Sequence, residues 1–281
     1  TLVTPSHCLQ IFEKLFFKEY PDLPEALKKP VSENKQIVFS ASFNNFGALE
    51  IVAKESLTNE QFDILHRFGK AFDGSYTRFN DLQKAEAQAR EAQIELGLER
   101  VRAAAMAMHK LSDLSAIGKT IFSELKMLGF AGIRNTEIVI NNDEQETVQS
   151  YHHSDYGKDE IIEINYQSNP IVMKWVKDLR KADNAFVPVS IPQKAIRSWD
   201  KYRKELGYKQ DPKMAMAREV HYYSYSTGLG ALSISTWQKL GGEEINILER
   251  FRNVFRLSYH RYIDIAKAET QARDAQIELG L

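Results

Sequence analysis

Hydrophobic and polar residues alternate along this chain with two different periods. A repeat of three to four residues, typical of amphipathic helices, covers residues 99–127 and the stretches that begin near residues 169, 192 and 243. A repeat of two residues, typical of strands, covers six shorter runs, at residues 135–140, 147–153, 161–166, 186–191, 219–226 and 231–236. This order of elements predicts an α+β fold in which an antiparallel sheet has helices on one side.

The sequence also repeats itself over a long distance. The segment KAEAQAREAQIELGL at residues 84–98 returns as KAETQARDAQIELGL at residues 267–281, so the two copies lie 183 residues apart. They differ only at Ala87, which corresponds to Thr270, and at Glu91, which corresponds to Asp274. Upstream of each copy, an apolar helical pattern and the runs FGALEI and LGALSI match at the same distance. A period this long indicates tandem domains, because solenoid repeats span about 20–50 residues.

The repeat predicts how the chain is divided. Residues 1–80 correspond to the C-terminal half of a first domain, and residues 81–114 form a connector helix. Residues 115–265 correspond to a complete second domain, and residues 266–281 to the start of the next connector. Half a domain leaves strand edges and an apolar face uncovered. We therefore expect the first domain to be completed by upstream residues or by a partner chain.

Two segments carry a resemblance to a known family. The run GLGALSIST at residues 228–236 is followed by GGEEINILERFRNVF at residues 241–255. A glycine-containing hydrophobic strand, an acidic helix start and a long apolar helix in this order resemble a GAF domain. The connector at residues 81–114 is similar to linkers of bacterial multi-domain sensor histidine kinases, in which GAF-like units alternate with coiled-coil signalling helices. The resemblance implies a sensory role in a two-component system, with the kinase part outside this chain.

Apolar residues of the connector recur at steps of four and three positions, as in the seam of a parallel helix pair. They are Ile94, Leu98, Val101, Ala105 and Met108. This seam predicts a homodimer in which the connector passes a rotation or a register shift from one domain to the next. A rigid spacer is the alternative, but a spacer needs only good helix formers. The near-identity of the two connector copies favours the first interpretation.

Composition limits the kinds of partner. The 281 residues include 37 Lys and Arg and 38 Asp and Glu, which gives a net charge of −1. This balance gives no electrostatic reason to expect nucleic acid as a partner. Apolar runs stay shorter than the roughly 20 residues that a membrane helix needs. We therefore expect a cytoplasmic protein with no membrane segment in this chain.

Aromatic side chains on the predicted strands and one helix form the candidate ligand pocket. The candidates are Tyr151, His153, Trp175, His221, Tyr223 and Tyr225. Three of them alternate along residues 219–226 and so share one strand face. Such a wall could stack or hydrogen-bond a small molecule between the sheet and the helices that cover it. The alternative is that these rings only complete a core or an interface.

Motifs for enzymatic chemistry are missing from the sequence. It contains no GxSxG, P-loop or HExxH motif and no GxGxxG after a strand. His152 and His153 are neighbours on a strand, so they face opposite sides and cannot both bind one metal ion. We therefore expect no enzyme activity and no metal site, and the sequence identifies no cofactor.

The favoured function is a non-catalytic sensory and signal-relay segment of a cytoplasmic signalling protein. In this hypothesis a ligand or partner changes the second domain, and the helices pass the change to an output domain outside this chain. The alternative is a purely structural module that dimerises and spaces other domains without a ligand.

Overall fold

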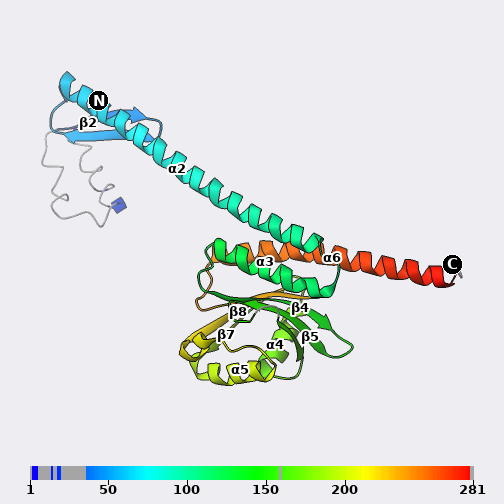
Figure 1. The fold of residues 1–281 in the computed structure, drawn as a ribbon. Helices are drawn as coiled ribbons and strands as arrows, with labels where there is room; N and C mark the ends of the chain where they lie inside the picture. The colour runs from blue at the N-terminus through cyan, green and yellow to red at the C-terminus, as the bar shows by residue number, and fades with distance from the viewer. Residues whose placement is uncertain (1, 6–13, 15–17, 20–35, 158–159, 279–281) are drawn as a thin grey trace. The chain divides into compact units, whose positions relative to one another are not determined.

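The computed structural model describes residues 2–5, 14, 18–19, 36–157 and 160–278 (Figure 1). The chain forms two compact units, residues 1–89 and 90–281. One long helix, α2 (Asn59–Met106), belongs to both, because its first part lies in the first unit and its last part in the second. The predicted connector is thus the continuation of the helix that precedes it. None of the helices that the structure describes combines the length and the apolar character of a membrane span.

The first unit contains a small antiparallel sheet. Its strands are β1 (Leu2–Pro5), β2 (Gln36–Asn44) and β3 (Gly47–Ala53), in the order β1-β2-β3. A capping box starts α2, since Thr58 N donates to Gln61 Oε1 at 2.8 Å and Gln61 N donates to Thr58 Oγ1 at 3.3 Å. The helix lies close to β2 at Gly69, which approaches Ser42, and the side chain of Leu65, one turn earlier, is buried.

The second unit contains a six-stranded antiparallel sheet, as the alternating pattern predicts. The strands are β4 (Ile133–Asn142), β5 (Thr147–Ser154), β6 (Glu160–Asn165), β7 (Phe186–Pro192), β8 (Glu219–Ser226) and β9 (Gly230–Thr236). Their order in the sheet is β6-β5-β4-β9-β8-β7. The last hairpin therefore inserts between the first hairpin and β7, which puts β8 and β9 near the middle of the sheet.

Helices cover both faces of this sheet, not one face as the sequence suggested (Figure 1). On one side lie the last part of α2, α3 (Leu114–Met127) and α6 (Gly242–Glu278). On the other lie α4 (Pro170–Leu179) and α5 (Gln193–Glu205), with a short 3-10 turn at Pro212–Met216. Another 3-10 turn, Leu111–Asp113, joins α2 to α3. Each strand of the sheet can therefore contact two separate cores, one on each face.

One glycine fixes the central hairpin. A Cβ at Gly230 would collide with the backbone carbonyl of Val139 on β4, so only glycine allows β9 to pair this closely with its neighbour. Two residues earlier, Gly228 has φ +83°, which favours glycine in the turn. The glycines of the GLGALS run thus have structural roles in joining β8, β9 and β4.

The apolar seam of the connector is buried inside its own chain. Ile94, Leu98, Val101, Ala105 and Met108 are all at most 6% exposed, in one core with α3 and α6. The prediction that this seam pairs two copies of the chain is therefore wrong for these five residues. The pattern has the expected helical spacing, but the helices that cover it come from the same unit.

The predicted helix at residues 99–127 is interrupted. Helix α2 ends at Met106, and α3 begins at Leu114. The Asp113 side chain accepts hydrogen bonds from the backbone N–H groups of His109 (2.9 Å) and Lys110 (3.1 Å). These two donors lie where the chain leaves the first helix, and the carboxylate stabilises the bend by satisfying them.

Candidate ligand-binding site

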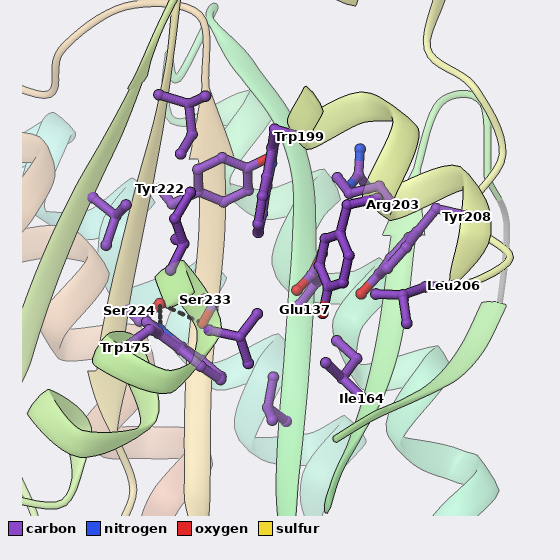
Figure 2. A pocket seen from close by; sticks show the side chains of 16 residues that line it. Glu137, Ile164, Trp175, Trp199, Arg203, Leu206, Tyr208, Tyr222, Ser224 and Ser233 are labelled. Atoms are coloured by element: carbon purple, nitrogen blue, oxygen red, sulfur yellow. Dashed lines mark hydrogen bonds between the residues drawn. The ribbon is translucent and has the colours of Figure 1, made fainter. Parts of the chain in front are cut away.

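A pocket lies between the sheet and the helices α4 and α5. Its lining comes from β4, β6, β7, β8, β9, both helices and the segment after α5, so most of the second unit contributes to it. Figure 2 shows Trp175, Ser224 and Ser233 at one end and Glu137, Arg203 and Tyr208 at the other. The remaining lining residues are Val139, Ile164, Ile171, Val172, Val189, Ile191, Trp199, Tyr202, Leu206 and Tyr222.

Hydrogen bonds of two tryptophans tie the helices to β8. Trp175 Nε1 on α4 donates to Ser224 Oγ at 2.9 Å, and Ser233 Oγ on β9 donates to the same oxygen at 2.7 Å (Figure 2). Trp199 Nε1 on α5 donates to Tyr222 Oη at 2.7 Å. Both indole N–H groups are therefore satisfied by β8 in the absence of a ligand, as buried donors require.

Glu137 places a largely buried carboxylate at the polar end of the pocket. Its Oε1 lies 2.9 Å from Asn135 Nδ2 and 3.1 Å from His152 Nδ1. Burial alone would raise the pKa of Glu137, but the hydrogen bond from His152 and the nearby positive charges hold it below its ordinary value. Glu137 is therefore an anion in the pocket wall, and it accepts bonds from two side chains.

Arg203 supplies the opposite charge from α5. Its side chain is 4% exposed, and its guanidinium carbon lies 4.3 Å from the centre of the Tyr208 ring. Burial would lower its pKa, but the ionisable Tyr222, Tyr208 and Glu137 around it raise it. Arg203 forms no ion pair within 4 Å with any residue that the structure describes. A buried cation without an ion pair favours a bound group that carries negative charge.

The pocket is small as it stands. Its volume is about 70 Å³, whereas a cavity of about 150 Å³ in another protein accommodates benzene. A second cavity of about 110 Å³ is lined by α4, by Asn141 and by the β8–β9 turn, and Trp175 lines both cavities. Trp175 is therefore a side chain whose movement would change the size of both spaces.

The structure separates the six predicted pocket residues. Only Trp175 lines the pocket. Tyr151, Tyr223 and Tyr225 are buried in the core with α2, α3 and α6, on the opposite face of the sheet. His153 packs against Phe122 of α3, with ring centres 5.3 Å apart. His221 Nδ1 lies 2.8 Å from Ser190 Oγ of the edge strand β7. For these five residues, packing is the role that the structure shows.

The pocket is lined from the strand face opposite to the one that carries the predicted residues. Tyr222 and Ser224 alternate with the predicted set along β8, and Trp199 and Arg203 lie one helical turn apart on α5. The available signal was the pair of helices α4 and α5, each of which carries tryptophan on its apolar side. Two tryptophans that need partners for their N–H groups favour a strand face with hydroxyl groups, which is the face of Tyr222 and Ser224.

The strands that line the pocket also hold α6. Tyr223, next to Tyr222 on β8, accepts a hydrogen bond on Oη from Leu240 N (3.0 Å), two residues before α6 begins. At the end of β8, Arg252 Nε of α6 donates to Ser226 O at 2.5 Å. In the turn that follows, His260 Nε2 of α6 lies 2.9 Å from Thr227 O. A displacement of β8 or of its turn would thus act directly on α6.

Among the residues that the structure describes, no group of three or more His, Cys, Asp or Glu side chains could hold a metal ion. No protein-family profile matches the sequence, and no curated protein is similar enough to be a relative.

Proposed function

We propose that the second unit is a sensory domain that converts binding of a small molecule into a change at α6. The observation that carries this proposal is the double contact of β8, which contributes Tyr222 and Ser224 to the pocket and Tyr223 to the start of α6. The domain itself is non-catalytic and belongs to a cytoplasmic signalling protein with GAF-like units. Its output domain lies outside this chain.

The mechanism begins with Trp175. A ligand with one aromatic ring needs more than the 70 Å³ of the pocket, so its entry rotates the indole and breaks the hydrogen bond from Trp175 to Ser224. The Ser224 hydroxyl then accepts from Ser233 alone instead of from both Ser233 and Trp175, and the end of β8 can shift toward the second cavity. Because Ser226 O is held by Arg252, that shift changes the position of α6.

The first experiment measures binding in solution with benzoate and phenol as probes. Both carry one aromatic ring, and only benzoate adds a carboxylate for Arg203. We expect benzoate to change the tryptophan fluorescence with a saturable curve and to raise the melting temperature, and phenol to do so more weakly. The variant Val189→Phe fills the pocket and should abolish both effects, while Val52→Phe, at an exposed position of β3, should leave them unchanged.

The second experiment follows the signal. Amide hydrogen exchange of residues 242–266 should change when benzoate binds, because α6 loses or gains contacts with the β8–β9 turn. In the variant Arg252→Lys, the charge remains but the fork that contacts Ser226 O and Asp183 O is lost. We expect Arg252→Lys to bind benzoate normally and to show a smaller exchange response in α6.

The alternative is a structural module that spaces other domains, and the small pocket volume favours it. Native mass spectrometry beside a denatured spectrum distinguishes the two. Extra mass that disappears on denaturation supports a bound small molecule. Bare protein mass, together with no response to benzoate or phenol, would contradict the sensory proposal.

A further inference from the structure

The first unit exposes an apolar row on α2. Its members, which we call the α2 apolar face, are Ile64, Phe68, Phe72, Tyr76 and Phe79. Phe68 is 64% exposed, and Phe72 is 48% exposed. The rings of Phe72, Tyr76 and Phe79 form a continuous row, with neighbouring centres 5.6 and 6.1 Å apart. An exposed row of large apolar side chains indicates a surface that another element covers.

The repeat shows what covers the equivalent row in the second unit. Phe68 corresponds to Phe251, and Phe72 to Phe255, and both counterparts on α6 are fully buried. They lie in one core with Ile94, Leu98 and Val101 of the connector part of α2, together with α3 and the sheet. At Gly97 the fit is close, because a Cβ there would lie 3.3 Å from Phe251 Cζ. In the second unit, a helix of connector sequence therefore packs on this row.

Ion pairs line the same contact. Arg250 Nη2 on α6 lies 2.6 Å from Glu91 Oε1 and 2.6 Å from Glu95 Oε1 on the connector. These contacts raise the pKa of Arg250, and the hydrogen bond from Arg250 lowers the pKa of Glu91. A second pair joins Arg90 Nε to Glu243 Oε1 at 3.2 Å. The connector thus presents two carboxylates and one guanidinium to complementary charges on α6.

The first unit carries the same charges without their partners. Arg67 stands at the position equivalent to Arg250, and Glu60 at the position equivalent to Glu243. Neither forms an ion pair within the part of the chain that the structure describes. The apolar row and both charges that hold the connector in the second unit are therefore present in the first unit, and no helix covers them within the residues that the structure describes.

The chain contains a second connector sequence at residues 267–281. Arg273, Asp274 and Glu278 repeat the charges of Arg90, Glu91 and Glu95, and Ile277 repeats Ile94. Helix α6 continues through Glu278, so this segment is helical as far as that residue. We infer that the α2 apolar face binds residues 267–281 of a second copy of this chain.

This contact joins two different surfaces. One copy offers the α2 apolar face, and the next offers its last residues, so the interface is heterologous and every copy carries both surfaces. Two copies can therefore exchange both contacts in a closed dimer, or further copies can add one after another. A closed dimer reaches a constant mass, whereas open association continues to grow with concentration.

Sedimentation velocity of the whole chain over a wide concentration range tests the inference. We expect the mass average to rise from the monomer value to the dimer value or beyond, and Arg67→Glu to weaken association about tenfold, since attraction to two carboxylates becomes repulsion. The control Lys70→Glu makes the same charge change on the opposite side of α2 and should have no effect. Combining Arg67→Glu with Asp274→Arg and Glu278→Arg should restore association by exchanging the charges.

A synthetic peptide of residues 84–106 provides an independent probe. It carries the sequence that covers α6 in the second unit, and it should compete with self-association by occupying the α2 apolar face. A chain that stays monomeric at all concentrations would overturn the inference, as would association that Arg67→Glu leaves unchanged. If the peptide binds to the α2 apolar face but the chain does not self-associate, a second copy of this chain is not what covers that face.

Discussion

The two units place nearly the same helix pattern in opposite surroundings. In the second unit, Phe251 and Phe255 of α6 are fully buried by the connector and α3. In the first, the equivalent Phe68 and Phe72 are largely exposed on α2. The helical spacing and the flanking charges agree in both units. An amphipathic pattern therefore identifies the helix face that another element covers, but it does not identify the covering element.

The difference also separates stability from recognition. A buried ring such as Phe251 contributes to the core that holds its unit together. An exposed ring such as Phe68 contributes little to the stability of its unit. When a partner covers it, the burial of the ring contributes to the free energy of binding instead. The same residue type at equivalent positions should thus respond to mutation in two different experiments.

The largest expected contrast is between Phe251→Ala and Phe68→Ala. Phe251→Ala leaves a cavity in the core and should lower the free energy of unfolding of the second unit by about 3–5 kcal/mol. Phe68→Ala should change the stability of the first unit by less than about 0.5 kcal/mol. All three tryptophans, Trp175, Trp199 and Trp237, lie in the second unit, so their fluorescence in urea follows that unit alone.

Hydrogen exchange of residues 59–80 provides the matching measurement for the first unit. If Phe68→Ala opened that part of α2 as strongly as Phe251→Ala opens the second unit, the α2 apolar face would already be covered within the chain. The two units would then not differ in whether this helix face is covered.

A smaller contrast concerns two glycines in α2. A side chain at Gly97 meets Phe251 and Glu124, since a Cβ would lie 3.3 Å from an atom of each. At Gly74 nothing lies within 4 Å of the added Cβ, and the equivalent residue of α6 is the exposed Leu257. Gly97→Leu should cost about 1–3 kcal/mol by overpacking. Gly74→Leu should stabilise its helix by about 0.5–1 kcal/mol, because leucine favours helix more than glycine does.

Urea unfolding followed by tryptophan fluorescence measures the Gly97→Leu cost, and hydrogen exchange of residues 59–80 measures the Gly74→Leu gain. Equal changes in the free energy of unfolding at the two glycines would contradict the close packing of Gly97 against Phe251 of α6.

Much of the fold follows from the sequence because periodicity reports local structure. The six strands and the amphipathic helices of the second unit stand where apolar residues recur with periods of two and of three to four. The connector seam also has the correct spacing. Its partner was assigned wrongly because Phe251, which lies in one core with Leu98, is far along the chain, and periodicity carries no information about such distant pairs.

The candidate site shows the same limit. Alternation along β8 correctly separates Tyr223 and Tyr225 from Tyr222 and Ser224. The alternation does not indicate which face of the sheet α4 and α5 cover, and the pocket lies on the face that they cover. Glu137 on β4 and Arg203 on α5 come into one pocket only through the tertiary fold. No local sequence pattern therefore predicts the charged end of the pocket.

The smallest expected contrast is in the pH dependence of the two units. Burial lowers the pKa of His221 below its ordinary value of 6.5, and the equivalent residue of the first unit is Val38, which cannot titrate. The unfolded chain therefore binds a proton at His221 more readily than the folded one does. Consequently, the free energy of unfolding of the second unit should fall as the pH drops below 6.5, until the pH reaches the folded pKa. In the variant His221→Gln, urea midpoints from tryptophan fluorescence should depend less steeply on pH over this range. An unchanged slope would show that His221 is as easily protonated in the folded unit as in the unfolded chain.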